Sequence, residues 1–251
     1  MVVTTAASPP LTRRLLAEFL GSALLVTVVV GSGIAAQRLS PDDTGLQLLE
    51  NSTATVFGLT VLILLFGPVS GAHFNPVVSV ADWFLGRREG HGLSLTDVGA
   101  YTIAQVVGAV LGSVLANAMF DVETAISTKN RATAGHMLAE VVATAVLVAL
   151  IFALARTGRG AMAAPAVGAY IGAAYWFTSS TSFANPAVTV GRMFSDTFAG
   201  IAPSSAPAFV IAQVVGLCVG AAMVLALYPR VGVQADDVVI PHPTSATRSQ
   251  P

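Results

Sequence analysis

The tripeptide Asn-Pro-small occurs twice in this 251-residue chain, and each copy stands in a similar frame. One copy lies in HFNPVVSVAD, from His73 to Asp82, and the other in FANPAVTVGR, from Phe183 to Arg192. Asn suits the N-cap of a helix, and Pro suits the first turn, where its missing N–H has no partner to lose. Each copy therefore predicts a helix start, and two such starts facing one another in a membrane would mark a solute site. The motif residues are Asn75, Pro76, Val77, Asn185, Pro186 and Ala187.

The composition indicates a membrane protein. Apolar residues make up 54% of the chain and charged residues 10%, whereas a soluble domain carries about 25% charged residues. The net charge of −1 favours no nucleic-acid partner. The single cysteine, Cys218, excludes an internal disulfide framework and fits a small packing residue. Arg13 and Arg14 precede an apolar run without an evident cleavage site, so we expect the first span to be kept as a signal anchor.

Six apolar segments are long enough to cross about 30 Å of hydrocarbon. Two shorter stretches, 74–85 and 184–194, contain the Asn-Pro motifs and are too short to cross. We interpret them as re-entrant half-helices, which are tolerated at membrane depth only inside protein or beside a wet cavity. The tails, 1–12 and 231–251, are rich in Pro, Ser and Thr and are expected to be disordered. The expected spans are 15–36, 51–69, 98–120, 136–156, 161–179 and 205–228.

The positions of Arg and Lys predict the orientation. With the N-terminus in the cytoplasm, the outer side holds Arg38, Lys129 and Arg131, and Arg192 lies in the second re-entrant segment. The positive-inside rule then favours both termini in the cytoplasm, which an even number of spans permits. We expect a multi-pass protein of the cell inner membrane or plasma membrane. The cytoplasmic arginines would be Arg13, Arg14, Arg87, Arg88, Arg156, Arg159, Arg230 and Arg248.

An internal repeat organises the chain. Ala-Glu recurs at 17–18 and 139–140, Asn-Pro at 75 and 185, and AQVVG at 104 and 212, with offsets of 122, 110 and 108 residues. Each repeat holds three spans, so the second copy must be inverted, and inverted repeats share a solute site near the midplane. We expect one channel domain over 1–251, with repeat one at about 15–120 and repeat two at about 136–228.

The two motif asparagines are the first candidates for contact with a solute. Asn75 and Asn185 would donate side-chain hydrogen bonds at the centre of a pore, beside the positive ends of the half-helix dipoles. The alternative is that both are ordinary N-caps in loops. The matched frames and the repeat favour the pore.

Two carboxylates stand inside apolar spans, one near the start of each repeat. Burying Glu18 and Glu140 there costs free energy unless their carboxylates are hydrogen-bonded. They therefore either relay protons in a carrier or accept hydrogen bonds from backbone N–H groups and hold the re-entrant loops. Their symmetry and the absence of Lys or Arg partners inside the membrane favour the second role. Gln105 and Gln213 would brace the same loops. His73 would bond its loop or line the pore, since no Cys or second His accompanies it as a metal ligand.

The chain resembles the aquaporin and glyceroporin family. The matching strings are AEFLG (17–21), SGAHFNP (70–76), AQVVG (104–108 and 212–216), AE (139–140) and FANPAVT (183–189), in family order. The resemblance implies an all-α, right-handed bundle of six membrane helices and two half-helices, with a pore in each subunit of a homotetramer. It also implies a passive channel rather than an enzyme, with no cofactor and no metal.

The residue after the second motif departs from the family pattern. Family members usually carry Arg there, at the outer constriction, and this chain has Val188. Arg192 follows one helical turn later, about 6 Å further out, where it either guards the vestibule or reaches water, and we favour water. A constriction without Arg would be wider, less polar and uncharged.

The resemblance places the other constriction residues by spacing. They fall at Ser182 and Ala173, and on the second span at Phe57 by the FGLTV match or at Thr55 by gap-free counting, of which we favour Phe57.

A wide constriction favours neutral solutes larger than water. The strings GPVSGAHFNP, FANPAVT and SDTFAGI (195–201) look like the bacterial branch associated with arsenic-resistance operons, which implies arsenite and other metalloid hydroxides, with glycerol and water as co-substrates. The alternatives are a water-selective channel, which Val188 argues against, and a proton-coupled carrier using the two buried glutamates.

Overall fold

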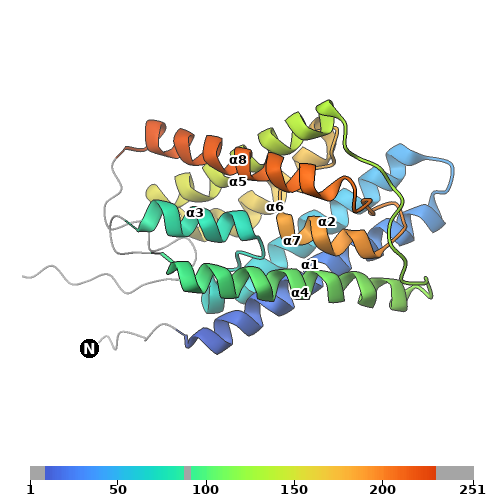
Figure 1. Cartoon of the computed structure of the whole chain (residues 1–251), viewed down its shortest axis with the longest axis horizontal. Coiled ribbons are helices and arrows are strands. Elements are labelled where there is room, and N and C mark those ends of the chain that lie inside the picture. Colours follow the sequence, from blue (N-terminus) through green and yellow to red (C-terminus); the bar gives the residue numbers. More distant parts are fainter. Residues whose placement is uncertain (1–8, 88–91, 230–251) are drawn as a thin grey trace, which may run out of the picture.

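The protein is a bundle of helices lying along one direction (Figure 1). The structure is a computed structural model that describes residues 9–87 and 92–229, and all regular elements within these ranges are helices. The first repeat forms α1 (Leu11–Leu39), α2 (Thr44–Ser70), α3 (Pro76–Gly86) and α4 (Leu95–Met119). The second forms α5 (Ala134–Arg156), a 3-10 turn (Gly160–Met162), α6 (Ala163–Phe177), α7 (Pro186–Gly191), a second 3-10 turn (Arg192–Phe194) and α8 (Ala206–Leu227).

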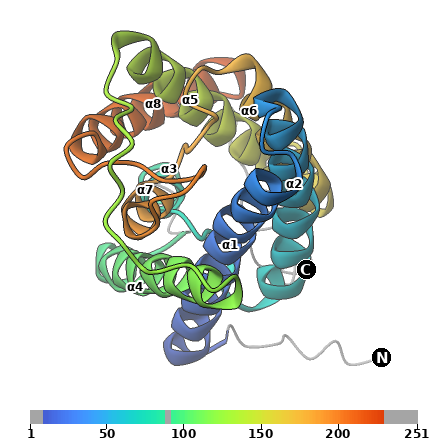
Figure 2. The same ribbon diagram turned by 90° about the vertical axis from the view of Figure 1, so that its right-hand side faces the viewer.

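The two short helices lie inside the bundle. Seen end on, α3 and α7 overlap and lie between α4 on one side and α8 with α5 on the other (Figure 2). In the side view they lie one beyond the other along the bundle (Figure 1), and they contact one another as well as α4 and α8. This is the arrangement expected of two re-entrant half-helices that meet tip to tip.

Side-chain caps begin most of these helices. Asp43 accepts from the N–H of Leu46 at the start of α2, and Ser94 and Thr133 cap α4 and α5 in the same way. Asn75 and Asn185 cap α3 and α7, each with Pro in the first turn. These caps satisfy N–H groups that would otherwise have no partner.

In the described part of the chain, five helices are long and apolar enough to span a membrane: α1, α2, α4, α5 and α8. The sixth expected span, 161–179, is the 15-residue α6, about 22 Å long and shorter than a ~30 Å hydrocarbon core. It ends early because Ser180, just beyond it, is hydrogen-bonded to the buried carboxylate of Glu140 at 2.6 Å, which turns the chain into the second re-entrant loop.

The termini differ in part from the expectation. Helix α1 begins at Leu11, so the last two residues of the expected N-terminal tail are helical. The remaining predictions of disorder, for 1–8 and 231–251, lie outside the described residues, as do Arg88, Arg230 and Arg248.

Glycines let the helices of each repeat approach closely. A Cβ on Gly112 of α4 would lie 2.2 Å from the carbonyl oxygen of Ala23 in α1. The matching contact in the second repeat is Gly220 of α8, whose Cβ would lie 2.5 Å from the carbonyl oxygen of Ala145 in α5. Such backbone contacts are how small residues hold membrane helices together.

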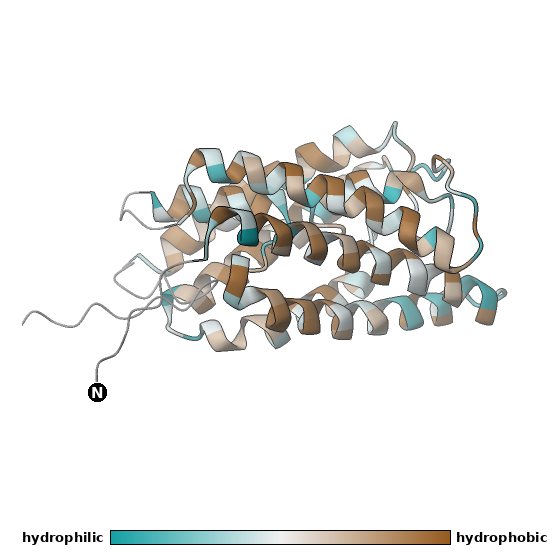
Figure 3. Cartoon of the chain, turned by 90° about the horizontal axis from the view of Figure 1, so that it is seen from below, coloured by the Kyte–Doolittle hydropathy of each residue, from teal (hydrophilic) through white to brown (hydrophobic). Residues whose placement is uncertain are grey.

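The helices of the bundle consist largely of apolar residues (Figure 3). Exposed hydrophobic side chains occur on every long helix, among them Phe57, Ile103 and Ile211, which are 66%, 68% and 65% exposed. A soluble protein would not expose so much contiguous apolar surface, so this surface is suited to lipid.

Candidate functional site

A cavity lies inside the bundle between the two re-entrant loops and helices α1, α2, α5 and α6. Its volume is about 90 Å³, counted as space open to the centres of water molecules, and one water needs roughly 10–15 Å³ on that measure. The cavity therefore holds a short file of waters or a small solute. Its wall is apolar on the long helices, from Leu25, Val29, Leu59, Ile63, Leu147, Ile151, Val167 and Ile171.

The two motif asparagines join the re-entrant loops at the centre. Asn75 Nδ2 donates to the carbonyl of Ala184 at 2.7 Å, and Asn185 Nδ2 donates to the carbonyl of Phe74 at 2.7 Å. The Oδ1 atoms cap the half-helices, so each asparagine is both a cap and a cross-link. An amide group has two N–H donors. Both residues line the cavity, which leaves each of them one donor for a solute.

The loop backbone before each asparagine is strained in the same way. Ala72 and Phe74 have φ of 50° and 49°, and the equivalent Ser182 and Ala184 have φ of 50° and 47°. Residues other than glycine rarely adopt this left-handed conformation, and such strain persists only where surrounding contacts enforce it. The buried glutamates provide those contacts.

Glu18 holds the first loop with four hydrogen bonds. Oε1 accepts from Ser70 Oγ at 2.6 Å and the N–H of His73 at 3.0 Å, and Oε2 accepts from the N–H of Phe74 and from Gln105 Nε2, both at 2.7 Å. The carboxylate is fully buried. Its hydrogen bonds replace the lost hydration and fix the direction of the loop N–H groups.

Glu140 repeats this arrangement at the second loop. Oε1 accepts from Ser180 Oγ at 2.6 Å and the N–H of Phe183 at 2.9 Å, and Oε2 accepts from the N–H of Ala184 at 2.8 Å and Gln213 Nε2 at 2.7 Å. The agreement with Glu18 is within about 0.1 Å at each contact. The geometry is that of a loop brace in both repeats, and the two glutamines take part as the sequence predicts.

His73 lies in the middle of the first loop and lines the cavity. Its Nδ1 lies 2.9 Å from Ser79 Oγ, and its ring packs edge-on against Tyr101 at 5.5 Å. Among the residues that the structure describes, no group of three or more His, Cys, Asp or Glu side chains could hold a metal ion.

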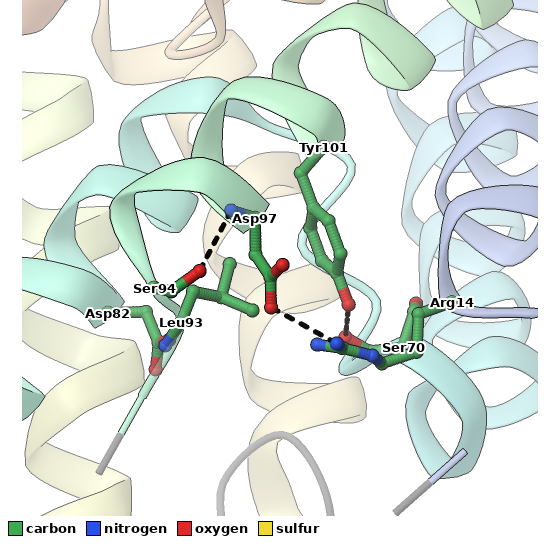
Figure 4. Close-up of polar contacts among 7 residues, drawn as sticks. All are labelled: Arg14, Ser70, Asp82, Leu93, Ser94, Asp97 and Tyr101. Carbon is green, nitrogen blue, oxygen red and sulfur yellow. Dashed lines mark hydrogen bonds and ion pairs between the residues drawn. The ribbon is translucent and has the colours of Figure 1, made fainter. Parts of the chain in front are cut away.

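A polar network at the same end of the bundle was not predicted from the sequence (Figure 4). Tyr101 of α4 donates through its hydroxyl to the carbonyl of Ser70, at the start of the first loop, at 3.0 Å. Arg14 and Asp97 form an ion pair at 3.1 Å that joins α1 to α4, and the Arg14 guanidinium lies 5.8 Å from the Tyr101 ring centroid. The tyrosine gave no sequence signal because a lone aromatic in an apolar span resembles any packing residue.

Two of the four expected constriction residues lie on the cavity wall and two do not. Val188 and Ser182 line the cavity. Phe57 is 66% exposed and points away from it, so the preference for Phe57 was wrong, and Thr55 lines the cavity instead. Two residues turn a helix by about 200°, which moves a side chain to the opposite face.

The prediction of Ala173 was also wrong, again by two residues. It is exposed on the outer face of α6, whereas Ile171 and Tyr175, two residues to either side, line the cavity. The Tyr175 hydroxyl lies 3.2 Å from Thr55 Oγ1 and connects α6 to α2 at this level. The polar part of the cavity wall therefore includes a tyrosine and a threonine that spacing alone did not identify.

Arg192 does not reach water as expected. Its side chain is 2% exposed and lines the cavity. Nε donates to the carbonyl of Ala199, and the guanidinium carbon lies 3.5 Å from the centroid of the Phe183 ring. An arginine one turn beyond Val188 therefore contributes to the cavity wall, where the sequence led us to expect no charge.

Comparisons with known proteins agree with this geometry. The model of the major intrinsic protein family matches residues 5–182. The chain is 50% identical over 221 residues to the aquaglyceroporin AqpS of Rhizobium meliloti strain 1021, covering 87% of this chain and 92% of that protein. It is 31% identical to the glycerol uptake facilitator protein of Pseudomonas aeruginosa, covering 88% of this chain and 90% of that protein.

A solved structure gives the same fold. The X-ray structure of the aquaglyceroporin from Plasmodium falciparum superposes with a TM-score of 0.60 at 22% identity, covering 88% of this chain and 97% of that one. The resemblance stated from the sequence motifs is thereby confirmed, and the helical bundle with it. The chain belongs to the major intrinsic protein family.

Proposed function

We propose that this protein conducts small hydroxylated neutral solutes, with glycerol and metalloid hydroxides such as arsenite as its main solutes and water passing with them. The coarser statement needs no proposal: the chain is a membrane channel for small solutes, not an enzyme, as are the aquaglyceroporins of its family. The observation that carries the finer statement is the amphipathic cavity, which has Val188 on its wall.

One side of the cavity offers hydrogen bonds along its length. The asparagine pair supplies donors at the centre. In the described parts of the chain, nothing donates to the loop carbonyls of Gly71, Ala72 and His73, which precede the first motif, or of Ser182 and Phe183, which precede the second. Glu18 accepts from two N–H groups of the first loop and Glu140 from two of the second, which holds both loops in place and leaves these carbonyls as acceptors. Pores select solutes through such lining groups.

The opposite side of the cavity is apolar. A polyol with hydroxyl groups on one edge and C–H groups on the other fits a wall that is polar on one side and apolar on the other. Water gains nothing from the apolar side, whereas glycerol can place its C–H edge there. Glycerol and arsenite are both uncharged and hydroxylated at neutral pH, so both can use the hydrogen-bonding side.

The width at Val188 separates this proposal from a water-selective channel. Valine is much shorter than arginine, so larger solutes pass the cavity at this level. In stopped-flow measurements on proteoliposomes, we expect glycerol and arsenite permeability well above that of empty vesicles. Val188→Arg should reduce the flux of both solutes by about tenfold and reduce water flux less. Water permeability without glycerol or arsenite permeability in the unmodified chain would contradict the proposal.

The carrier alternative gains no support from the glutamates. Each carboxylate already accepts four hydrogen bonds and is fully buried, so neither is open to a passing proton. Solute uptake should therefore be independent of an imposed pH gradient. Uptake that stops when the gradient is dissipated would favour a carrier instead.

We further propose that the protein is a homotetramer in the cell inner membrane or plasma membrane, with both termini in the cytoplasm and one channel domain per chain. The apolar exposed faces of the long helices supply surface for both lipid and subunits. The mass of the detergent-solubilised protein by light scattering tests the tetramer. Orientation is testable with Cys218→Ala as a background, a single cysteine introduced at Ser249, and a thiol reagent that does not cross the membrane.

A further inference from the structure

We propose that Arg192 supplies the fixed positive charge of the constriction beside Val188, from one helical turn beyond the usual position, and that this charge excludes protons and other cations. The inference rests on the proposed channel function. It concerns a different property, the selectivity against charge, so the two are tested by separate measurements.

The first observation is the position of the side chain. Val188 and Arg192 are four residues apart, so they lie on the same side of α7 and the turn that follows it. Both line the cavity, and Arg192 is only 2% exposed. A buried arginine on a cavity wall faces whatever passes through that cavity.

The second observation is that the guanidinium is held in place. Nε donates to the Ala199 carbonyl, and the group stacks on the Phe183 ring at 3.5 Å. The ring itself packs edge-on against Phe209 at 5.0 Å. Stacking and a directed hydrogen bond restrict the planar guanidinium to one orientation, so its charge stays at one place in the wall.

The third observation is that neighbouring carbonyls accept two more cations. The Phe198 carbonyl accepts from Lys129 Nζ at 3.1 Å and from Arg131 Nη2 at 3.0 Å, and the Gly200 carbonyl accepts from Arg131 Nε at 2.8 Å. Together with the Arg192 contact, three successive carbonyls of segment 198–200 hold three cations. The backbone segment thus fixes a cluster of positive charge beside the cavity.

No carboxylate neutralises Arg192 within the part of the chain that the structure describes. The ion pair found there joins Arg14 to Asp97, in the first turn of α4, and does not involve Arg192. Asp196, the nearest acidic residue in sequence, is turned to Thr128, whose N–H donates to it at 2.9 Å. The positive charge of Arg192 is therefore not cancelled locally, and a cation entering the cavity meets it directly.

The same wall carries donors for a neutral solute. In residues 9–87 and 92–229, the hydrogen bond of the Arg192 side chain runs from Nε to the Ala199 carbonyl, and Ser182 Oγ, in a residue 4% exposed, has no partner. The Thr55–Tyr175 pair lies on the same cavity wall. A hydroxylated neutral solute replaces its lost water contacts on these groups, whereas a cation gains no acceptor from the guanidinium.

The test compares proton leak with glycerol permeability in proteoliposomes. Glycerol permeability of the unmodified chain above empty vesicles tests the channel itself. For Arg192→Gln we expect proton leak under a fixed pH difference to rise at least about tenfold while glycerol still enters. Arg192→Lys should stay as proton-tight as the unmodified chain. A glycerol-permeable Arg192→Gln variant that leaks no more than the unmodified chain would overturn the inference, and so would an Arg192→Lys variant that leaks as much as Arg192→Gln.

Arg38 offers a matched control. It also donates to a backbone carbonyl, that of Phe120, and lies over a phenylalanine ring at 5.6 Å, but it is exposed and outside the cavity lining. Arg38→Gln should leave proton leak unchanged. If Arg38→Gln leaked protons as much as Arg192→Gln, positive charge outside the cavity would suffice to exclude protons. That result would overturn the inference.

A titratable variant keeps the test decisive if Arg192→Gln fails to fold. In Arg192→His, the side chain carries a charge at low pH and loses it at higher pH, since histidine titrates near pH 6.5. The proton leak of this variant, divided by that of the unmodified chain at the same pH, should be at least about tenfold larger at pH 8 than at pH 5.5. A ratio that does not change with pH would refute the role of the charge.

Discussion

Glu140→Gln is the most direct test of how the second re-entrant loop is held. The substitution keeps the shape of the side chain and removes its charge and one acceptor oxygen. Each oxygen of Glu140 accepts one loop N–H and one side-chain donor. Whichever oxygen becomes an NH₂ group, a backbone N–H, that of Phe183 or of Ala184, then faces a donor and stays unsatisfied.

The cost follows from these contacts. An unsatisfied buried donor costs about 1–3 kcal/mol. The remaining two hydrogen bonds lose their ionic character, and bonds to charged groups are worth roughly 1 kcal/mol more each than neutral ones. The loss of stability is therefore about 3–5 kcal/mol. The loop carries the left-handed residues before Asn185, so its relaxation also moves the amide that cross-links the two loops.

The assay is thermal unfolding in detergent combined with glycerol permeability in liposomes. At about 2–4 °C per kcal/mol for a chain of this size, the melting temperature of Glu140→Gln should fall by at least about 6 °C and permeability should drop severalfold. Glu18→Gln should behave alike because its contacts match. Glu123→Gln, at an exposed position, is the control without effect. An unchanged melting temperature together with unchanged permeability in Glu140→Gln would refute the brace.

Two further pairs of variants test the packing and the constriction. Gly112→Ala should destabilise the protein by about 1–3 kcal/mol, because the added Cβ meets a backbone carbonyl of α1 that cannot move away. Gly99→Ala in the same helix, where a Cβ has nothing within 4 Å, should stabilise the protein by up to about 1 kcal/mol. Equal unfolding temperatures of the two variants would contradict close packing at Gly112. Thr55→Phe should fill part of the cavity and lower glycerol flux about tenfold, and Phe57→Ala, on the outer face, should leave flux near that of the unmodified chain. The reverse order of fluxes would return the constriction to Phe57.

Much of the architecture follows from local sequence signals. The Asn-Pro dipeptides specify where α3 and α7 begin, since a capping amide and a proline at the first turn favour a helix start without outside help. The paired Ala-Glu and AQVVG strings specify the repeat, and a buried carboxylate must find donors wherever the chain takes it. The roles of Glu18 and Glu140 were therefore predictable in kind, although not in their four-bond detail.

The face that a helix turns to the cavity was not predictable in the same way. Phe57 and Ala173 were each two residues from a side chain that lines the cavity, namely Thr55 and Tyr175. In spans that are apolar all round, periodicity does not mark the inner side. The rotation of α2 and α6 is set by their packing on one another, where Gly168 of α6 meets Thr60 of α2.

The sequence by itself determined that the chain enters a membrane, repeats with inversion and brings two Asn-Pro helix starts together. These properties depend on composition, spacing and capping, which act over a few residues. Only the tertiary structure decided that Arg192 lies in the cavity wall instead of in water, because segment 198–200 folds back and offers carbonyls that no local pattern announces. Whether the constriction carries a charge depends on that long-range contact, and the residue after the second motif could not reveal it.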